Sequence, residues 1–263
     1  MPGFDSDINR MRVAAALGIS LSEETLTELT LYNIALAHQK AGQIQIDIAT
    51  KSQEKAHGAD WEWWLITNKK NICYRVQAKR LFPNGRYSSL YKSGSGNPYA
   101  QLDTLVAAAK TNHAVPMYCF YNFNHSNAGF GTSSQCLHKY RGPSYWGCTL
   151  AAAQDVRTAG ANDAATLRHI MLPWHLFACA HHGEDLVDTG TRFVSDRHLG
   201  PSDDIFLNKG QTRPLPAYVE RLIETRRSIN PRQNADYLDD QYWTETKEKE
   251  DLAGIAVFID VRE

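Results

Sequence analysis

Two neighbouring stretches of the sequence decide the fold: Asp60-Trp-Glu-Trp-Trp-Leu-Ile66 and Ile72-Cys-Tyr-Arg-Val-Gln-Ala-Lys-Arg-Leu81. Both are rich in aromatic and β-branched residues, which favour strands. The polar segment between them, Asn68-Lys-Lys-Asn71, is typical of a hairpin connection. We therefore expect two adjacent strands, with an acid at the start of the first and Gln77-Ala-Lys79 near the end of the second.

The flanking segments extend this pair into an α/β pattern. Residues 20–39 predict a helix, which Ser20-Leu-Ser-Glu23 would open as a capping box, and residues 44–48 alternate as a strand does. We expect a second helix over residues 99–110 and a buried strand over residues 116–123. The order helix, three strands, helix, strand is typical of a mixed sheet flanked by helices.

The second half of the chain gives weaker patterns. The segments with an expected structure are a short strand over 146–149, a helix over 150–159, a buried segment over 169–179, a polar loop over 185–209, a helix over 215–229, a mobile stretch over 230–251 and a final strand over 253–261. We expect a core formed by residues 1–123. Residues 124–263 should be a C-terminal α/β elaboration packed on that core and not an independent domain.

Composition bounds the kind of protein. The chain has 263 residues, a net charge of −1 and no apolar run long enough to cross a membrane, so we expect a cytoplasmic protein with no membrane partner. Its five cysteines are widely and irregularly spaced, which favours reduced, buried thiols over a disulfide framework. The stretch from Asn68 to Lys92 is basic and contains no acid, so it is either a surface for phosphates or an ordinary solvated face.

The two strands also carry the residues of a metal site. Because strand side chains alternate between faces, Gln77 and Lys79 project the same way, and Asp60 on the neighbouring strand lies within their reach. The Asp60 carboxylate, the Gln77 side-chain oxygen and the Ala78 carbonyl are hard oxygen ligands suited to Mg²⁺. An ion so held can activate water for attack on a phosphodiester, while Lys79 orients or deprotonates that water and neutralises developing charge.

Glutamine is a neutral ligand, so further acids matter. Glu28 on the first helix and Glu54, just before Asp60, are the two candidates to complete the metal shell directly or through water. Each has an alternative role. Glu28 can belong to a capping box with Thr25, and Glu54 can be an exposed loop acid.

On these residues the sequence resembles the PD-(D/E)xK nuclease superfamily, which has the restriction-endonuclease-like fold. It is most similar to the D…QxK variant found in Mrr-like nucleases, over about residues 20–123. The resemblance implies Mg²⁺-dependent cleavage of DNA, with Mn²⁺ as a substitute and RNA as a possible substrate. It also implies that Asp60 and Gln77 are ligands and that Lys79 is the catalytic lysine. The superfamily makes restriction or antiphage defence the natural setting, with a homodimer or a defence partner.

Four residues are candidate substrate contacts. Arg80 belongs to the basic stretch, and Tyr91 and Lys92 lie in the expected loop over the cleft. Gln101 opens the second helix, and in Mrr-like relatives a helix glutamine can lie near the active site. Tyr91 has packing on the core as its alternative, and Gln101 has an ordinary helix-end role.

Three competing interpretations stay open at this stage. Gln77 allows a catalytically inactive, nuclease-fold module that only binds nucleic acid. A set of histidine and cysteine side chains allows a zinc site without an evident second ligand pair: His175, Cys179, His181 and His182. The tryptophans of the first strand, Trp61, Trp63 and Trp64, favour core roles, with base stacking as the alternative for Trp64.

Overall fold

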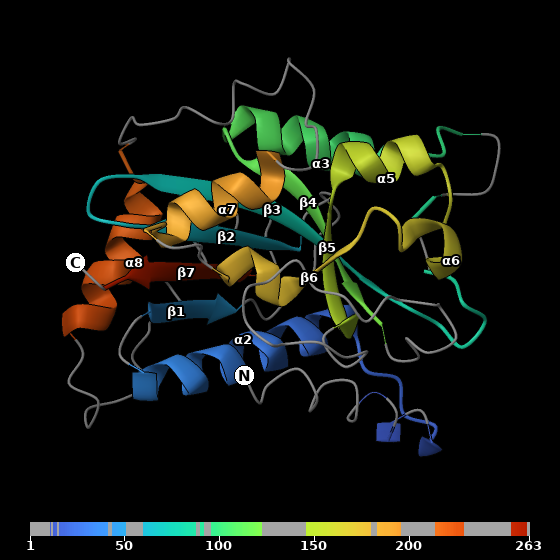
Figure 1. The fold of residues 1–263 in the computed structure, drawn as a ribbon, viewed down its shortest axis with the longest axis horizontal. Helices are drawn as coiled ribbons and strands as arrows, with labels where there is room; N and C mark the ends of the chain where they lie inside the picture. The colour runs from blue at the N-terminus through green and yellow to red at the C-terminus, as the bar shows by residue number, and fades with distance from the viewer. Residues whose placement is uncertain are drawn as a thin grey trace.

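The computed structural model describes eleven stretches of the chain, and all structural statements below concern them. They are residues 11, 13–14, 16–41, 44–50, 60–87, 90–91, 96–122, 146–179, 183–195, 214–228 and 254–261. The chain forms an α/β fold in which helices cover both faces of a mixed sheet (Figure 1). Within the described stretches, no helix is both long and apolar enough to span a membrane.

A seven-stranded sheet with the order β1-β7-β2-β3-β4-β5-β6 forms the centre of the molecule. Its strands are β1 (Ile44–Thr50), β2 (Trp61–Ile66), β3 (Asn71–Arg80), β4 (Val115–Tyr121), β5 (Cys148–Ala152), β6 (Leu172–Pro173) and β7 (Gly254–Asp260). The pairs β2–β7 and β3–β4 are parallel, and the other neighbours are antiparallel. The expected strand pair is therefore confirmed as an antiparallel hairpin at the middle of the sheet.

Each face of the sheet buries its own hydrophobic core. One face packs against α2 (Glu23–Ala41), the 3₁₀ helix η2 (Trp174–Ala178) and α7 (Leu186–Ser195). The other packs against α3 (Ala100–Thr111), α5 (Ala153–Ala159), α6 (Ala164–Leu167) and α8 (Ala217–Ser228). Figure 1 shows α2 below the strands, with α3 and α5 above them. The strands read as near-continuous apolar runs because both of their faces are covered.

The tryptophans of β2 follow this division. Trp61 and Trp63 are buried in the core beneath α2 and α7, where Trp63 meets Trp174 and Phe177 edge to face. Trp64 is buried on the opposite face and donates from Nε1 to Glu62 Oε1 at 2.6 Å. The core role is thus confirmed for all three, and Trp64 is not open to stack on a base.

The division of the chain at residue 123 does not separate two structural units. β7, at the C-terminal end of the described chain, lies between β1 and β2 and pairs with both. β5 and β6 extend the same sheet beyond β4. The C-terminal half therefore supplies an internal strand of the core and does not merely pack upon it.

The segment expected to be a polar loop over residues 185–209 contains the helix α7, so that prediction was wrong for its first part. Asp260 accepts from the Leu186 backbone N–H at 3.0 Å, and Asp185 accepts from that of Asp188 at 2.8 Å. These carboxylates satisfy N–H groups at the helix start and suit its dipole. Gly190 within the segment obscured its helical pattern in the sequence. A glycine is required there by close packing, because a Cβ would lie 2.5 Å from Leu65 Cδ1.

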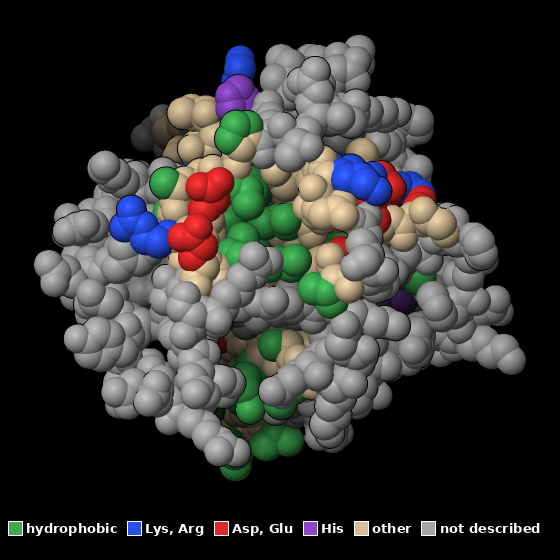
Figure 2. Space-filling view, turned by 90° about the vertical axis from the view of Figure 1, so that its left-hand side faces the viewer, with side chains coloured by type: hydrophobic (Ala, Val, Ile, Leu, Met, Phe, Trp, Pro, Cys, Tyr) green, Lys and Arg blue, Asp and Glu red, His purple; other side chains and the backbone are tan. Residues whose placement is uncertain are grey.

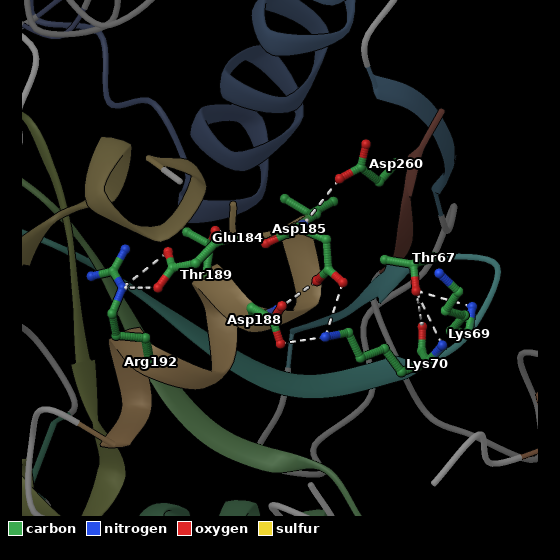
Figure 3. A network of polar contacts seen from close by, with 10 residues as sticks. Thr67, Lys69, Lys70, Glu184, Asp185, Asp188, Thr189, Arg192 and Asp260 are labelled. Atoms are coloured by element: carbon green, nitrogen blue, oxygen red, sulfur yellow. Dashed lines mark hydrogen bonds and ion pairs between the residues drawn. The ribbon is translucent and has the colours of Figure 1, made fainter. Parts of the chain in front are cut away.

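Polar contacts tie α7 to the β2–β3 hairpin (Figure 3). The Lys70 ammonium binds Asp185 at 2.9 Å and also Asp188, and Arg192 binds Glu184 at 2.9 Å. Deeper in the sheet, Arg75 pairs with the buried Glu62 at 3.2 Å. Figure 2 likewise shows acidic and basic side chains close together on one face. Part of the basic stretch is therefore neutralised within the fold, and Lys70 and Arg75 are not free to hold phosphates.

The first helix begins two residues later than the expected capping box. Ser22, and not Ser20, accepts the backbone N–H of Thr25 at 3.1 Å and caps α2. Thr25 lies inside the helix, so it does not cap a later turn that contains Glu28. Glu23 and Glu24 accordingly fall in the first turn, where acids suit the helix dipole. The stretch expected to be mobile, residues 230–251, lies outside the described residues.

Candidate active site

The register of β2 against β3 builds the site. Trp61 pairs with Val76, so Asp60, one residue before β2, stands opposite Gln77. The main chain of Asp60 is held on both sides: its N–H donates to Val76 O at 3.0 Å, and its carbonyl accepts from Gly254 N at 3.1 Å. Hydrogen bonds to β3 and β7 therefore fix the backbone position from which the Asp60 side chain projects.

The Asp60 carboxylate is held by two donors from β3. Its Oδ2 accepts from the Ala78 backbone N–H at 2.8 Å and from Gln77 Nε2 at 2.5 Å. No described residue donates to Oδ1. One carboxylate oxygen is thus fixed by the fold, and the other is left for a further ligand.

Gln101 joins the other two residues of the motif. Lys79 Nζ donates to Gln101 Oε1 at 3.0 Å, and Gln101 Nε2 donates to Gln77 Oε1 at 3.2 Å. Gln77 and Lys79 are 3 % and 5 % exposed, so these bonds are made away from bulk water. The predicted grouping of Asp60, Gln77, Lys79 and Gln101 is therefore present in the structure. Gln101 contacts side chains of the site itself.

Burial governs the ionisation of the two charged groups. Desolvation raises the pKa of Asp60, although the Ala78 hydrogen bond, the Lys79 charge and the Gln77 hydrogen bond oppose the rise. Desolvation lowers the pKa of Lys79, although the charges of Asp60 and Glu23 oppose this shift. For each group, the cost of removing its charge from water exceeds the stabilisation that neighbouring groups give to the charged form. Such shifted pKa values are found at catalytic sites.

The first helix presents a different acid from the one expected. Glu28 is exposed on α2, whereas the charge of Glu23 affects both Asp60 and Lys79. The two residues are five positions apart on the helix, so their side chains point about 140° apart around the helix axis. Glu23, and not Glu28, is therefore the acid of α2 whose charge reaches Asp60 and Lys79. Glu54 lies outside the described residues.

Tyr118 is a site residue that the sequence did not indicate. It lies on β4 directly opposite Gln77, is fully buried, and its hydroxyl has no hydrogen-bond partner among the described residues. Burial raises its pKa, with smaller contributions from Tyr91 and Asp60, so the hydroxyl stays protonated at neutral pH. The signal was hidden because Tyr118 stands in an apolar run whose strand neighbours the sequence does not specify.

The remaining candidate substrate contacts have structural partners or are not described. Arg80 donates to Ser20 Oγ at 2.6 Å and to the Leu21 carbonyl at 2.5 Å, so it anchors the start of α2. Tyr91 donates to the Val156 carbonyl at 2.6 Å and meets Tyr99 edge to face, which favours its packing alternative. Lys92 lies outside the described residues.

The histidine and cysteine cluster gives no zinc site in the described chain. His175 and Cys179 are both buried in or beside η2, and His181 and His182 lie outside the described residues. Over the described stretches, no group of three histidine, cysteine, aspartate or glutamate side chains is placed to hold a metal. The candidate ligands for a hard cation are instead oxygens of mixed type.

These oxygens fit a divalent cation after one rearrangement. Asp60 Oδ1 is available, and the Ala78 carbonyl belongs to the residue whose N–H holds Oδ2. Tyr118 adds a buried hydroxyl without a hydrogen-bond partner among the described residues. Gln77, however, turns its nitrogen and not its oxygen toward Asp60. Its amide must turn over before Gln77 Oε1 can act as a ligand.

Comparison with known proteins identifies a family. The model of a family described as a family of unknown function, DUF6615, matches residues 7–257, a span that includes every described residue of the site. No curated protein and no solved structure matches the chain.

The raised pKa of Asp60 predicts how stability changes with pH. Since the folded protein holds this proton more tightly than the unfolded chain, whose ordinary value is 3.8, the free energy of unfolding should fall as pH rises through the folded pKa. An asparagine at this position cannot titrate. The stability of the metal-free native protein relative to Asp60→Asn should therefore decline over this window and then level off, as measured by urea unfolding at a series of pH values.

Asp163 supplies a control of opposite sign. Its burial opposes ionisation, but hydrogen bonds from Thr166 lower its pKa below the ordinary value. Relative to Asp163→Asn, native stability should rise with pH below the ordinary value of 3.8, from the folded pKa of Asp163 up to that value, and then level off. A flat or rising profile for the Asp60 comparison would show that its carboxylate is not destabilised by burial.

Proposed function

Given that the chain belongs to DUF6615, a family of unknown function, we propose its function from the site: a Mg²⁺-dependent nuclease that hydrolyses phosphodiester bonds of DNA. One observation carries the proposal. The Asp60 carboxylate, the Gln77 amide and the Lys79 ammonium form one buried cluster at the ends of two paired strands, with Glu23 close enough to influence the charges. An acid and a second oxygen ligand can hold a divalent cation, and a lysine can stabilise the charge that develops on a phosphodiester during hydrolysis.

In this proposal, Asp60 Oδ1, Gln77 Oε1 and the Ala78 carbonyl would hold the cation, and Mn²⁺ could replace Mg²⁺. Bound Mg²⁺ would supply positive charge to the scissile phosphate and lower the pKa of the attacking water. Ala78 N–H keeps Asp60 Oδ2 in place throughout, so the carboxylate presents its other oxygen without losing its position. Glu23 adds a negative charge at the start of α2, either as a ligand or through water.

Lys79 has the role of catalytic lysine. The residue is 5 % exposed and its ammonium is hydrogen-bonded to Gln101, so little solvent screens the charge. There it can neutralise the charge that develops on the phosphate and orient the water for attack. The lowered pKa also brings Lys79 closer to the range in which a lysine accepts a proton at neutral pH.

The arrangement of elements supports a restriction-endonuclease-like core as part of the same proposal. α2, β1, β2, β3, α3 and β4 follow one another in the order that the resemblance implies, with Asp60 before β2 and Gln77 and Lys79 on β3. By analogy with the superfamily, we place the protein in restriction or antiphage defence in the cytoplasm, acting as a homodimer or with a defence partner. RNA is the alternative substrate.

A nucleic-acid-binding module without cleavage is the second candidate, and a specific observation favours it. Gln77 turns a nitrogen toward Asp60, and only one carboxylate among the described residues makes hydrogen bonds within the cluster. A protein that had lost metal affinity would keep these side chains hydrogen-bonded to one another, with no cation between them. Cleavage assays separate the two candidates.

We expect purified protein to cut plasmid or linear DNA in the presence of Mg²⁺ or Mn²⁺ and to be inactive with EDTA. Lys79→Ala should reduce the single-turnover rate by about 10²- to 10³-fold, because it removes a preorganised charge from the reacting phosphate. Asp60→Ala should abolish cleavage through loss of the metal. Gel assays on double-stranded DNA, single-stranded DNA and RNA measure the rate and the preferred substrate.

Lys110→Ala is the matched control, since Lys110 is an exposed lysine in the last turn of α3. It should leave the rate unchanged. Cleavage that survives in both site variants would place the chemistry elsewhere. DNA binding by the native protein without cleavage under any metal condition would favour the second candidate.

The two acids of α2 give a further matched pair. Glu23→Gln should weaken Mn²⁺ binding by about 10-fold, since it removes a charge that reaches both Asp60 and Lys79. Glu28→Gln should leave Mn²⁺ affinity unchanged, because Glu28 is exposed on α2. Isothermal titration calorimetry of the two variants measures the difference. Equal losses of Mn²⁺ affinity in the two variants would contradict a special role for Glu23. A loss in Glu28→Gln alone would assign the role to Glu28.

A further inference from the structure

The four polar side chains of the site form one directed chain of hydrogen bonds. It runs from Lys79 Nζ to Gln101 Oε1, from Gln101 Nε2 to Gln77 Oε1, and from Gln77 Nε2 to Asp60 Oδ2, at 3.0, 3.2 and 2.5 Å. Lys79 can only donate and the ionised Asp60 carboxylate can only accept. The two ends therefore fix the orientation of both amides, and neither amide can turn over alone without setting donor against donor.

This orientation is incompatible with metal binding by Gln77. A cation bound by both Asp60 and Gln77 would need the oxygen, and not the nitrogen, of the Gln77 amide on the side that faces Asp60. When the Gln77 amide turns over, its Nε2 faces Gln101 Nε2, so the Gln101 amide must turn as well. Gln101 then presents an N–H group to the Lys79 ammonium, and the bond between them is lost.

We propose that Gln101 is a positioning residue: it holds Gln77 in its non-ligating orientation, and metal binding reverses both amides and releases the Lys79 ammonium toward the substrate. The inference rests on the proposed function, because it concerns the same cation. It deepens that function by linking the cation to the catalytic lysine through two neutral side chains. The resting site is thereby held closed by its own hydrogen bonds, and the cation opens it.

The decisive variant is Gln101→Leu, which removes the group that holds Gln77 Oε1 while adding no charge. The Gln77 amide is then held in its present orientation only by its bond to Asp60, so Mn²⁺ affinity should rise by about 5-fold, the equivalent of one ordinary hydrogen bond. A residue that merely supported the fold would lower affinity when removed. Electron paramagnetic resonance of free Mn²⁺ measures the dissociation constant without reference to activity.

Gln154→Leu is the control, because it makes the same substitution at an exposed position on α5 and should leave Mn²⁺ affinity unchanged. Gln101→Met, which keeps an unbranched side chain, replaces the leucine variant if thermal unfolding shows that the latter is not folded. A second readout uses the side-chain amide signals in ¹H–¹⁵N spectra. Titration with Mg²⁺ should shift those of Gln77 and Gln101 together in the native protein.

The outcomes distinguish failure of this inference from failure of the proposed function. Tighter Mn²⁺ binding in the Gln101 variant, with binding lost in Asp60→Asn, supports the amide reversal. Unchanged or weaker binding in the Gln101 variant, with native binding that still depends on Asp60, overturns the reversal and leaves the metal site standing. Native protein that binds no Mn²⁺ through Asp60 overturns both.

Discussion

The site depends on a single constraint, the antiparallel register that sets Asp60 against Gln77. A hydrogen bond from Ala78 N–H to Asp60 Oδ2 links the side chain of one strand to the backbone of the next. A slip of one residue would carry Gln77 and Lys79 to the opposite face of the sheet. The apolar residues between them prevent that slip, because Val76 and Ala78 fill the core beneath α2 while Gln77 and Lys79 face the α3 side.

The C-terminal strand is the second support of this register. β7 lies parallel to β2, and Gly254 N–H binds the Asp60 carbonyl just where β2 begins. Buried charges flank the site on the same strands, since Glu62 and Arg75 pair two residues along from Asp60 and Gln77, and Tyr218 of α8 also donates to Glu62. Breaking such a buried pair leaves an uncompensated charge, so these contacts restrict how β2 and β3 can move.

The sequence predicted the hairpin, both principal helices and the grouping of Asp60, Gln77 and Lys79, because strand alternation and apolar runs are local signals. It missed contacts that depend on strand order. Nothing local places β7 between β1 and β2, or sets Tyr118 opposite Gln77. Glu28 was the predicted helix acid, but the charge that reaches Asp60 and Lys79 is that of Glu23, because tertiary packing decides which side of α2 faces the sheet. Helix α7 was hidden by Gly190, whose tight packing against Leu65 and Tyr74 is a tertiary requirement.

The most direct test of the account is the position of a bound cation. Crystals of the protein soaked in MnCl₂ should show an anomalous difference peak within about 2.5 Å of Asp60 Oδ1, with the Gln77 amide turned so that its oxygen faces the ion. The same peak should be absent from Asp60→Asn crystals that diffract equally well. A Mn²⁺ peak that avoids Asp60, or none in native crystals that retain the Gln77 nitrogen against the carboxylate, would contradict the proposed metal-dependent site.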